Sequence, residues 1–88
     1  MSQIAKLFTK VCSGKADKNV KFLELRRLLI ALGFSLNRIE GDHFIFIKDG
    51  IPEIINIQPD KRDSSKAKSV QVKQIRYLIE KYHMEVKQ

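Results

Sequence analysis

The stretch FSLNRIEGDHFIFIKDGIPEIINIQ, residues 34–58, decides the fold, because it contains three consecutive strand patterns separated by turn signals. Those patterns cover residues 34–39, 42–48 and 51–58. The pair Asp49-Gly50 predicts a hairpin with a type I′ turn, in which both central residues have positive φ. Pro52 cannot donate a hydrogen bond within a sheet, so it belongs at the start of the third strand or on a sheet edge. The stretch therefore predicts a three-stranded antiparallel meander.

The second and third strands are apolar on both faces. In the second strand Phe44 and Phe46 point to one side and Ile45 and Ile47 to the other, because successive side chains of a strand alternate. The isoleucines of the third strand are Ile54, Ile55 and Ile57. An antiparallel sheet with helices on one face is normally polar on the other. The second apolar face is therefore expected to be covered by the N-terminal helix or by another protein.

Two long helical patterns flank the meander. Apolar residues recur at helical spacing over residues 21–32, and Gly33 follows in the position where a left-handed residue commonly ends a helix. After the meander, Ser69 is the expected N-cap of a final helix that runs to about Tyr82. Its apolar stripe consists of Val72, Ile75, Leu78, Ile79 and Tyr82.

The N-terminal segment predicts a shorter helix within residues 1–13, ended by Gly14 and followed by a polar linker up to Asn19. The whole chain, residues 1–88, is then a single α+β domain with its core at about residues 21–83. Without the first helix the order is α-β-β-β-α, the arrangement of double-stranded-RNA-binding folds. In that arrangement two helices pack on one side of a three-stranded antiparallel sheet.

Length and composition describe an ordinary globular chain of 88 residues with 43% hydrophobic residues. The longest apolar run, Leu28 to Leu32, is far shorter than the roughly 20 residues of a membrane-spanning helix. No secretory signal pattern is present, so a cytoplasmic location is expected. Cys12 is the only cysteine, which excludes an internal disulfide and a clustered zinc site, and no metal or cofactor motif occurs.

The net charge of +7 is concentrated in two basic segments on either side of an acidic middle. Residues 61–76 carry six Lys/Arg against one Asp/Glu, whereas residues 28–60 carry two against five. Such a distribution is typical of a protein that binds a polyanion. The alternative is that the polar segment PDKRDSSKAKS, residues 59–69, which we call the basic loop, is merely solvated. The candidate phosphate-binding residues are Lys61, Arg62, Lys66, Lys68 and Lys73. A second, weaker cluster, for which solvation is the favoured explanation, consists of Lys15, Lys18 and Lys21.

The two histidines have different expected roles. RNA cleavage without a metal needs a group that removes the proton of a 2′-hydroxyl, and histidine titrates nearest to neutral pH. His43 follows Gly41-Asp42 at the start of an apolar strand, where it is either such a base or simply a half-buried strand residue. Asp42 could orient its ring, although neighbours along a strand point to opposite faces. His83, at the end of the final helix, is expected to cap that helix.

Several segments together resemble the HicA family, the toxin half of bacterial toxin-antitoxin pairs. They are LLIALGF, EGDHFIF, the Asp-Gly turn, EIINIQ and KAKSVQVKQIRYLIEKY, in the order in which the family has them, from about Lys21 to Tyr82. The resemblance implies an mRNA interferase, an endoribonuclease that cleaves mRNA independently of the ribosome and arrests translation. The family's glycine-(Ser or Thr)-histidine signature falls on Gly41, Asp42 and His43, which makes His43 the implied catalytic residue. Asp42 departs from the usual hydroxyl residue.

The resemblance also implies a partner, a HicB-type antitoxin protein that binds the toxin and blocks its active site. No cofactor, metal or membrane is part of this expectation. Two alternatives stay open: an RNA-binding module of the same fold that cleaves nothing, and a purely structural domain that binds a protein partner. The residue that would supply the second proton transfer is left unassigned, with water or a cation of the basic loop as candidates.

Overall fold

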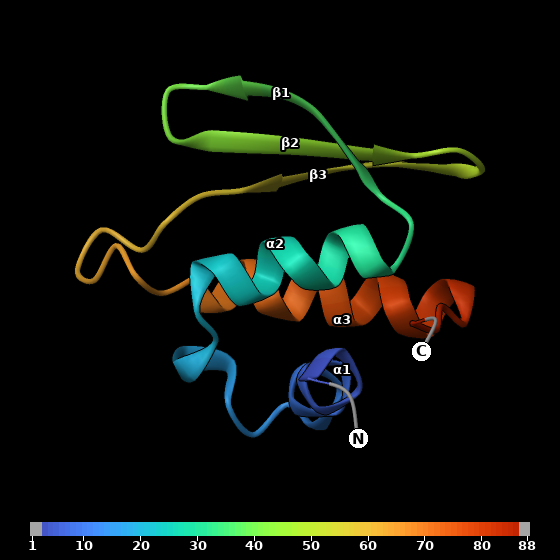
Figure 1. Cartoon of the computed structure of the whole chain (residues 1–88), viewed down its shortest axis with the longest axis horizontal. Coiled ribbons are helices and arrows are strands. Elements are labelled where there is room, and N and C mark those ends of the chain that lie inside the picture. The colour runs from blue at the N-terminus through green and yellow to red at the C-terminus, as the bar shows by residue number, and fades with distance from the viewer. Residues whose placement is uncertain (1–2, 87–88) are drawn as a thin grey trace.

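A computed structural model describes residues 3–86, and its helices and strands follow the predicted order (Figure 1). The elements are α1 (Gln3–Ser13), a short 3₁₀ helix η1 (Asp17–Asn19), α2 (Phe22–Ala31), β1 (Ser35–Glu40), β2 (His43–Lys48), β3 (Ile51–Ile57) and α3 (Ser69–Tyr82). Each predicted helix and strand is present with its ends within a few residues of expectation. Over residues 3–86 the class is α+β, with three α-helices and one antiparallel sheet.

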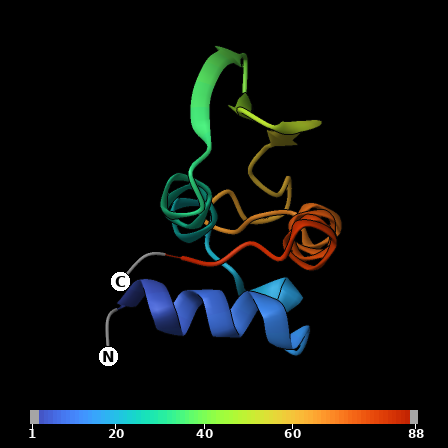
Figure 2. The same cartoon turned by 90° about the vertical axis from the view of Figure 1, so that its right-hand side faces the viewer.

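The sheet has the strand order β1-β2-β3, and α2 and α3 lie side by side against one of its faces (Figures 1 and 2). Pro52 is the second residue of the edge strand β3, as its missing N–H group requires. The hairpin at Asp49-Gly50 is confirmed, but the type I′ turn is wrong. Gly50 alone of the two central residues has a positive φ, 84°. A bulge between Phe46 and Lys48 adds local twist beside the turn, so a second left-handed residue is not needed there.

The core lies between the sheet and the two long helices. Phe46 of β2 and Leu25 of α2 are at most 1% exposed, and the apolar stripe predicted for α3 is buried apart from Tyr82. Side chains of this core fill the space between the layers, as close-packed interiors require. Among residues 3–86, no helix is long and apolar enough to cross a membrane.

α1 packs beneath α2 and α3, on the side away from the sheet, so the molecule has three layers (Figure 2). Two of its buried residues, Leu7 and Val11, join the main core cluster from below. The expectation that this helix covers the second face of the sheet is therefore excluded. On that face Ile54 is 62% exposed and Ile47 is 39% exposed. We call it the open face.

The segment between α1 and α2 is not a loose linker. Asp17 in η1 accepts two hydrogen bonds from the Arg76 guanidinium of α3, at 2.7 and 3.1 Å, and Arg76 also donates to the Val11 carbonyl. The ion pair raises the pKa of Arg76. Both side chains are largely buried, at 20% and 10% exposure. The polar composition of this segment suggested a linker. The Asp17–Arg76 contact joins residues 59 positions apart, so local patterns in the sequence do not reveal it.

The start of α3 differs from the prediction by one residue. Lys68 occupies the N-cap position with extended backbone, and Ser69 is the first helical residue without a capping hydrogen bond from its side chain. The preceding chain is fixed by backbone pairing instead, because the Ala67 N–H donates to the Val20 carbonyl. The entry to α3 is therefore positioned by this pairing with the chain before α2, and not by a serine cap.

Candidate functional site

His43 begins β2 directly after a two-residue turn. Its cross-strand partner is Glu40, and Gly41 and Asp42 form the turn between them. Gly41 has a φ of 60°, a left-handed conformation that favours glycine over residues with a side chain. A glycine at this position therefore lets the chain reverse tightly and fixes where the histidine leaves the turn.

The His43 ring lies on the open face. The next residue, Phe44, points to the helices, where its ring packs edge-on against Phe22 at 5.1 Å and lies under the Arg26 guanidinium at 4.6 Å. Because strand side chains alternate, His43 points to the opposite side. Its side chain is 46% exposed. The ring is thus accessible to a ligand in solution.

Two side chains approach the two nitrogens of the ring. The Nδ1 atom lies 3.1 Å from Oδ1 of Asn56, and the Nε2 atom lies 3.6 Å from Oδ1 of Asp42. Asn56 comes from β3, where its Cα partner is Ile45, so it is the diagonal neighbour of His43 on the open face. Asn56 was not among the site residues predicted from the sequence. The available signal was a polar amide inside the otherwise apolar strand EIINIQ.

Asp42 contacts the ring because it belongs to the turn and not to the strand. The rule that neighbours on a strand point to opposite faces does not apply to it, since β2 starts at His43. The Asp42 side chain is 64% exposed and can rotate into water. Nearby on β1, Arg38 and Glu40 form an exposed ion pair at 3.0 Å. One amide and one carboxylate therefore approach the imidazole itself, and the Arg38–Glu40 pair lies on the strand across from it.

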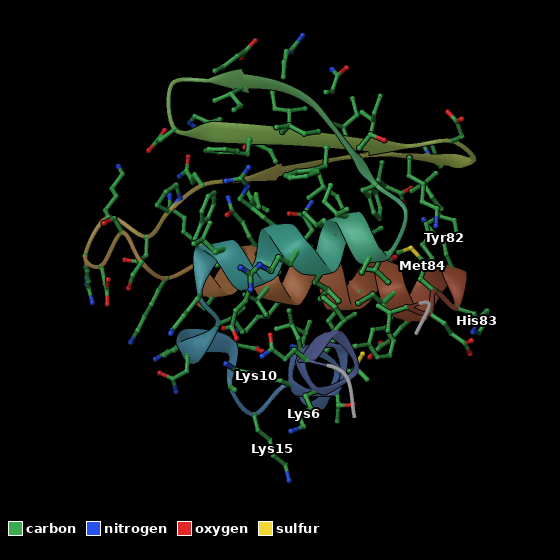
Figure 3. All side chains as sticks on the ribbon, in the orientation of Figure 1. Lys6, Lys10, Lys15, Tyr82, His83 and Met84 are labelled. Atoms are coloured by element: carbon green, nitrogen blue, oxygen red, sulfur yellow. The ribbon has the colours of Figure 1, made fainter. Side chains whose placement is uncertain are left out.

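The basic loop and the turn at residues 41–42 lie at the same end of the molecule (Figure 1). Lys61 and Arg62 are exposed in this loop, Lys66 and Lys68 are half-buried, and Lys73 is exposed on α3. Arg62 and Lys66 line a hollow of about 310 Å³ together with Lys18, a member of the weaker predicted cluster. Lys21 is joined to Lys66 by a backbone bridge, whereas Lys15 lies beside α1 on the far side of the helices (Figure 3).

Two aspartates shape the basic loop from within. Asp60 accepts a hydrogen bond from the Arg62 N–H at 2.7 Å. Asp63 accepts from both the hydroxyl and the N–H of Ser65, at 2.6 and 3.0 Å, and these hydrogen bonds lower the pKa of Asp63. These hydrogen bonds hold the loop in a defined shape, in which Arg62 and Lys66 line the hollow.

His83 is remote from His43. It occupies the C-cap position of α3 with a left-handed φ of 52°. Figure 3 places it at the end of the molecule opposite the turn at residues 41–42. The predicted position at the helix end is confirmed, and the ring cannot take part in chemistry at His43.

A second surface feature is an apolar groove between α2 and β1, which the sequence analysis did not identify. The groove has a volume of about 640 Å³ and is lined by Ile4, Leu23, Arg26, Arg27, Ile30, Ala31, Leu36 and Phe46. Leu23 and Ile30 are 59% and 56% exposed, since they lie outside the stripe of α2 that faces the core. β1, the neighbouring edge strand, is exposed along its whole length.

No protein-family model, curated protein or solved structure matches this chain. Within residues 3–86, no three His, Cys, Asp or Glu side chains gather where they could hold a metal ion.

Proposed function

We propose that this protein is a HicA-like toxin, a small cytoplasmic endoribonuclease that cleaves mRNA and thereby arrests translation. The observation that carries the proposal is the His43 imidazole, which is exposed on the open face next to the Gly41-Asp42 turn and held by Asn56. The order α2-β1-β2-β3-α3, with both helices on one face of the sheet, supports the double-stranded-RNA-binding-like fold that the resemblance implies.

The proposed reaction uses the 2′-hydroxyl of the substrate as its nucleophile. Neutral His43 removes the proton of this hydroxyl, and the oxygen attacks the adjacent phosphorus. The bond from phosphorus to the 5′-oxygen breaks, and the leaving oxygen takes a proton from water or from the imidazolium. The products are a 2′,3′-cyclic phosphate and a 5′-hydroxyl. Arg62 and Lys66 stand at the same end of the molecule and are the proposed contacts to neighbouring phosphates.

Loose sequence preference follows from this arrangement. Phosphate contacts provide affinity and register without reading bases. RNA helices are recognised mainly through shape and 2′-hydroxyls, which suits both the proposed fold and a nucleophile that only RNA possesses.

The proposed protein partner is a HicB-type antitoxin. Two exposed apolar areas support a partner: the groove between α2 and β1, and the isoleucines of the open face. Arg26 and Arg27 line the groove, so an acidic partner surface would be favoured electrostatically. A partner that covers the open face would also bury His43 and block substrate.

The test is to induce the wild-type chain and His43→Ala in bacteria and to follow growth and mRNA integrity. Wild type is expected to arrest growth and degrade mRNA, and the variant to do neither, because loss of a general base costs about 10²–10⁴-fold in rate. His83→Ala is the matched control and should behave as wild type. Equal behaviour of wild type and His43→Ala would overturn the enzyme and favour the RNA-binding module, for which the departure at Asp42 is the specific observation.

The role of the basic loop is tested by the salt dependence of RNA binding. Each lost phosphate contact should reduce the slope of log affinity against log salt by about 0.7 for single-stranded RNA. Lys66→Ala and Lys68→Ala are expected to show this loss. Lys6→Ala removes the same charge from α1, on the side of α2 and α3 away from the sheet (Figure 3), and should leave the slope unchanged.

A further inference from the structure

The contact between Asn56 and His43 joins two strands on the open face. The Nδ1 atom of the ring and Oδ1 of the amide are 3.1 Å apart, a normal hydrogen-bond distance. The two residues are 13 positions apart in the sequence and meet only through the register of β2 and β3. The antiparallel ladder therefore fixes the amide relative to the ring.

The chemistry of the amide oxygen decides which ring nitrogen carries the proton. A carbonyl oxygen only accepts hydrogen bonds, so Nδ1 must donate and must be protonated. A neutral imidazole has one N–H, which leaves the lone pair on Nε2. The amide thus selects one tautomer and one ring orientation.

The other polar groups around the ring agree with Nε2 as the atom that exchanges protons. Asp42 faces Nε2 at 3.6 Å and can pair with it once the ring is an imidazolium. When the ring is neutral, a carboxylate opposite a lone pair is unfavourable, and the exposed Asp42 side chain is free to turn towards water. Glu40, the cross-strand partner of His43, is paired with Arg38 at 3.0 Å.

We propose that Asn56 is the positioning residue of the active site, which holds His43 so that Nε2 receives the proton of the 2′-hydroxyl. This inference rests on the proposed endoribonuclease function. During the reaction Nδ1–H stays donated to Asn56 while Nε2 gains the substrate's proton and later releases it to the leaving oxygen or to water. Asn56 touches neither substrate nor reacting atoms, and it acts only by orienting the imidazole.

The first test reads the tautomer directly and needs no activity. Long-range ¹H–¹⁵N correlation spectra of the full chain at about pH 9, where an ordinary histidine is neutral, report which nitrogen of each ring is protonated. His83→Gln assigns the two sets of signals. We expect His43 to carry its proton on Nδ1 in the wild type and to lose this preference in Asn56→Leu. A wild-type His43 protonated on Nε2 would overturn the proposal.

The second test uses cleavage of a short RNA by purified protein. Asn56→Leu is expected to lower kcat by about 10–100-fold, by analogy with the loss of groups that orient metal-bound histidines. Asn37→Leu, an equivalent change at an exposed position of β1, is the control for loss of an amide. Asn56→Asp keeps an acceptor at Nδ1 and should retain more activity than Asn56→Leu.

The pH profile separates orientation from a merely structural role. The carboxylate of Asn56→Asp adds negative charge beside a ring that already faces Asp42 and Glu40, so the imidazolium persists to higher pH. The limb of kcat/KM that reports the free base should move to higher pH in this variant. An unmoved limb, or equal activity of Asn56→Leu and wild type, would contradict the proposal.

The outcomes distinguish the two proposals. A wild type that cleaves RNA but carries the His43 proton on Nε2 removes Asn56 from the mechanism and leaves the proposed function standing. If wild-type His43 carries its proton on Nδ1 but neither the wild type nor any variant cleaves RNA, the proposed function is wrong, and the positioning role is wrong with it.

Discussion

Polar groups are largely buried and paired on the underside of the helical layer, whereas they are exposed and make few contacts on the open face of the sheet. Beneath α2 and α3, the Asp17–Arg76 pair is 10–20% exposed and tied to the backbone by a further hydrogen bond to Val11. On the open face, His43 and Asp42 are 46% and 64% exposed and make one 3.1 Å contact and one longer approach. The buried pair fastens α3 to the N-terminal segment. The exposed pair contributes little to folding, which leaves it available for chemistry.

Breaking the core should have the largest effect on folding. Leu25 of α2 is fully buried, so Leu25→Ala is expected to lower the free energy of unfolding by about 2–5 kcal/mol. Urea denaturation followed by circular dichroism measures this change. Leu23→Ala, on the exposed side of the same helix, is the control and should cost much less. Equal losses would mean that the buried stripe of α2 is assigned to the wrong side.

Breaking the ion pair beneath the helices should have an intermediate effect. Asp17→Asn removes the charge but keeps the size, and it leaves the Arg76 guanidinium in a largely enclosed site without its carboxylate. We expect a loss of about 1–3 kcal/mol in the free energy of unfolding. The same substitution at the exposed Asp49 should change it by less than about 0.5 kcal/mol. Equal losses of stability for Asp17→Asn and Asp49→Asn would contradict the conclusion that the largely buried ion pair stabilises the fold more than an exposed carboxylate does.

The smallest expected effect is a pH dependence of the folding stability that comes from Glu53 on the edge strand β3. Lys81 and Tyr82 both donate hydrogen bonds to Glu53 and lower the pKa of that carboxyl, Lys81 with the larger effect. A lowered pKa in the folded state stabilises the protein above the range in which free glutamate titrates, near pH 4, and this stabilisation is lost as the pH falls further. Glu53→Gln should therefore lower Tm by about 1–4 °C at neutral pH. The difference from wild type should shrink towards pH 3 or so, and a constant difference would contradict the assignment.

Local patterns in the sequence predicted most of the fold. Alternation gave the three strands, helical spacing gave α1, α2 and α3, and Gly33 and Gly50 take the left-handed conformations expected of them. The predicted type of the Asp49-Gly50 turn was wrong because the pairing of β2 with β3 contains a bulge between Phe46 and Lys48, which depends on the strand register and not on the Asp-Gly pair itself. The cap of α3 was wrong because backbone pairing of Ala67 fixes the chain there.

The site was predicted only in part, because its contacts are tertiary. His43, Gly41 and Asp42 stand out in the sequence, and the exposure of the ring agrees with the role proposed for it. Asn56 was missed because its contact depends on the register between β2 and β3. The groove beside α2 was missed because Leu23 and Ile30 lie outside the apolar stripe of α2, and the edge strand β1 that completes the groove meets them only in the folded chain.

The most direct test of the central claim is cleavage of a DNA strand that contains a single ribonucleotide. If exposed His43 activates a 2′-hydroxyl, the purified protein cuts only after that ribonucleotide and leaves a 2′,3′-cyclic phosphate and a 5′-hydroxyl, and His43→Ala cuts about 10²–10⁴-fold more slowly. Cutting of the all-deoxy strand at the same rate, or cutting that His43→Ala leaves unchanged, would contradict the account.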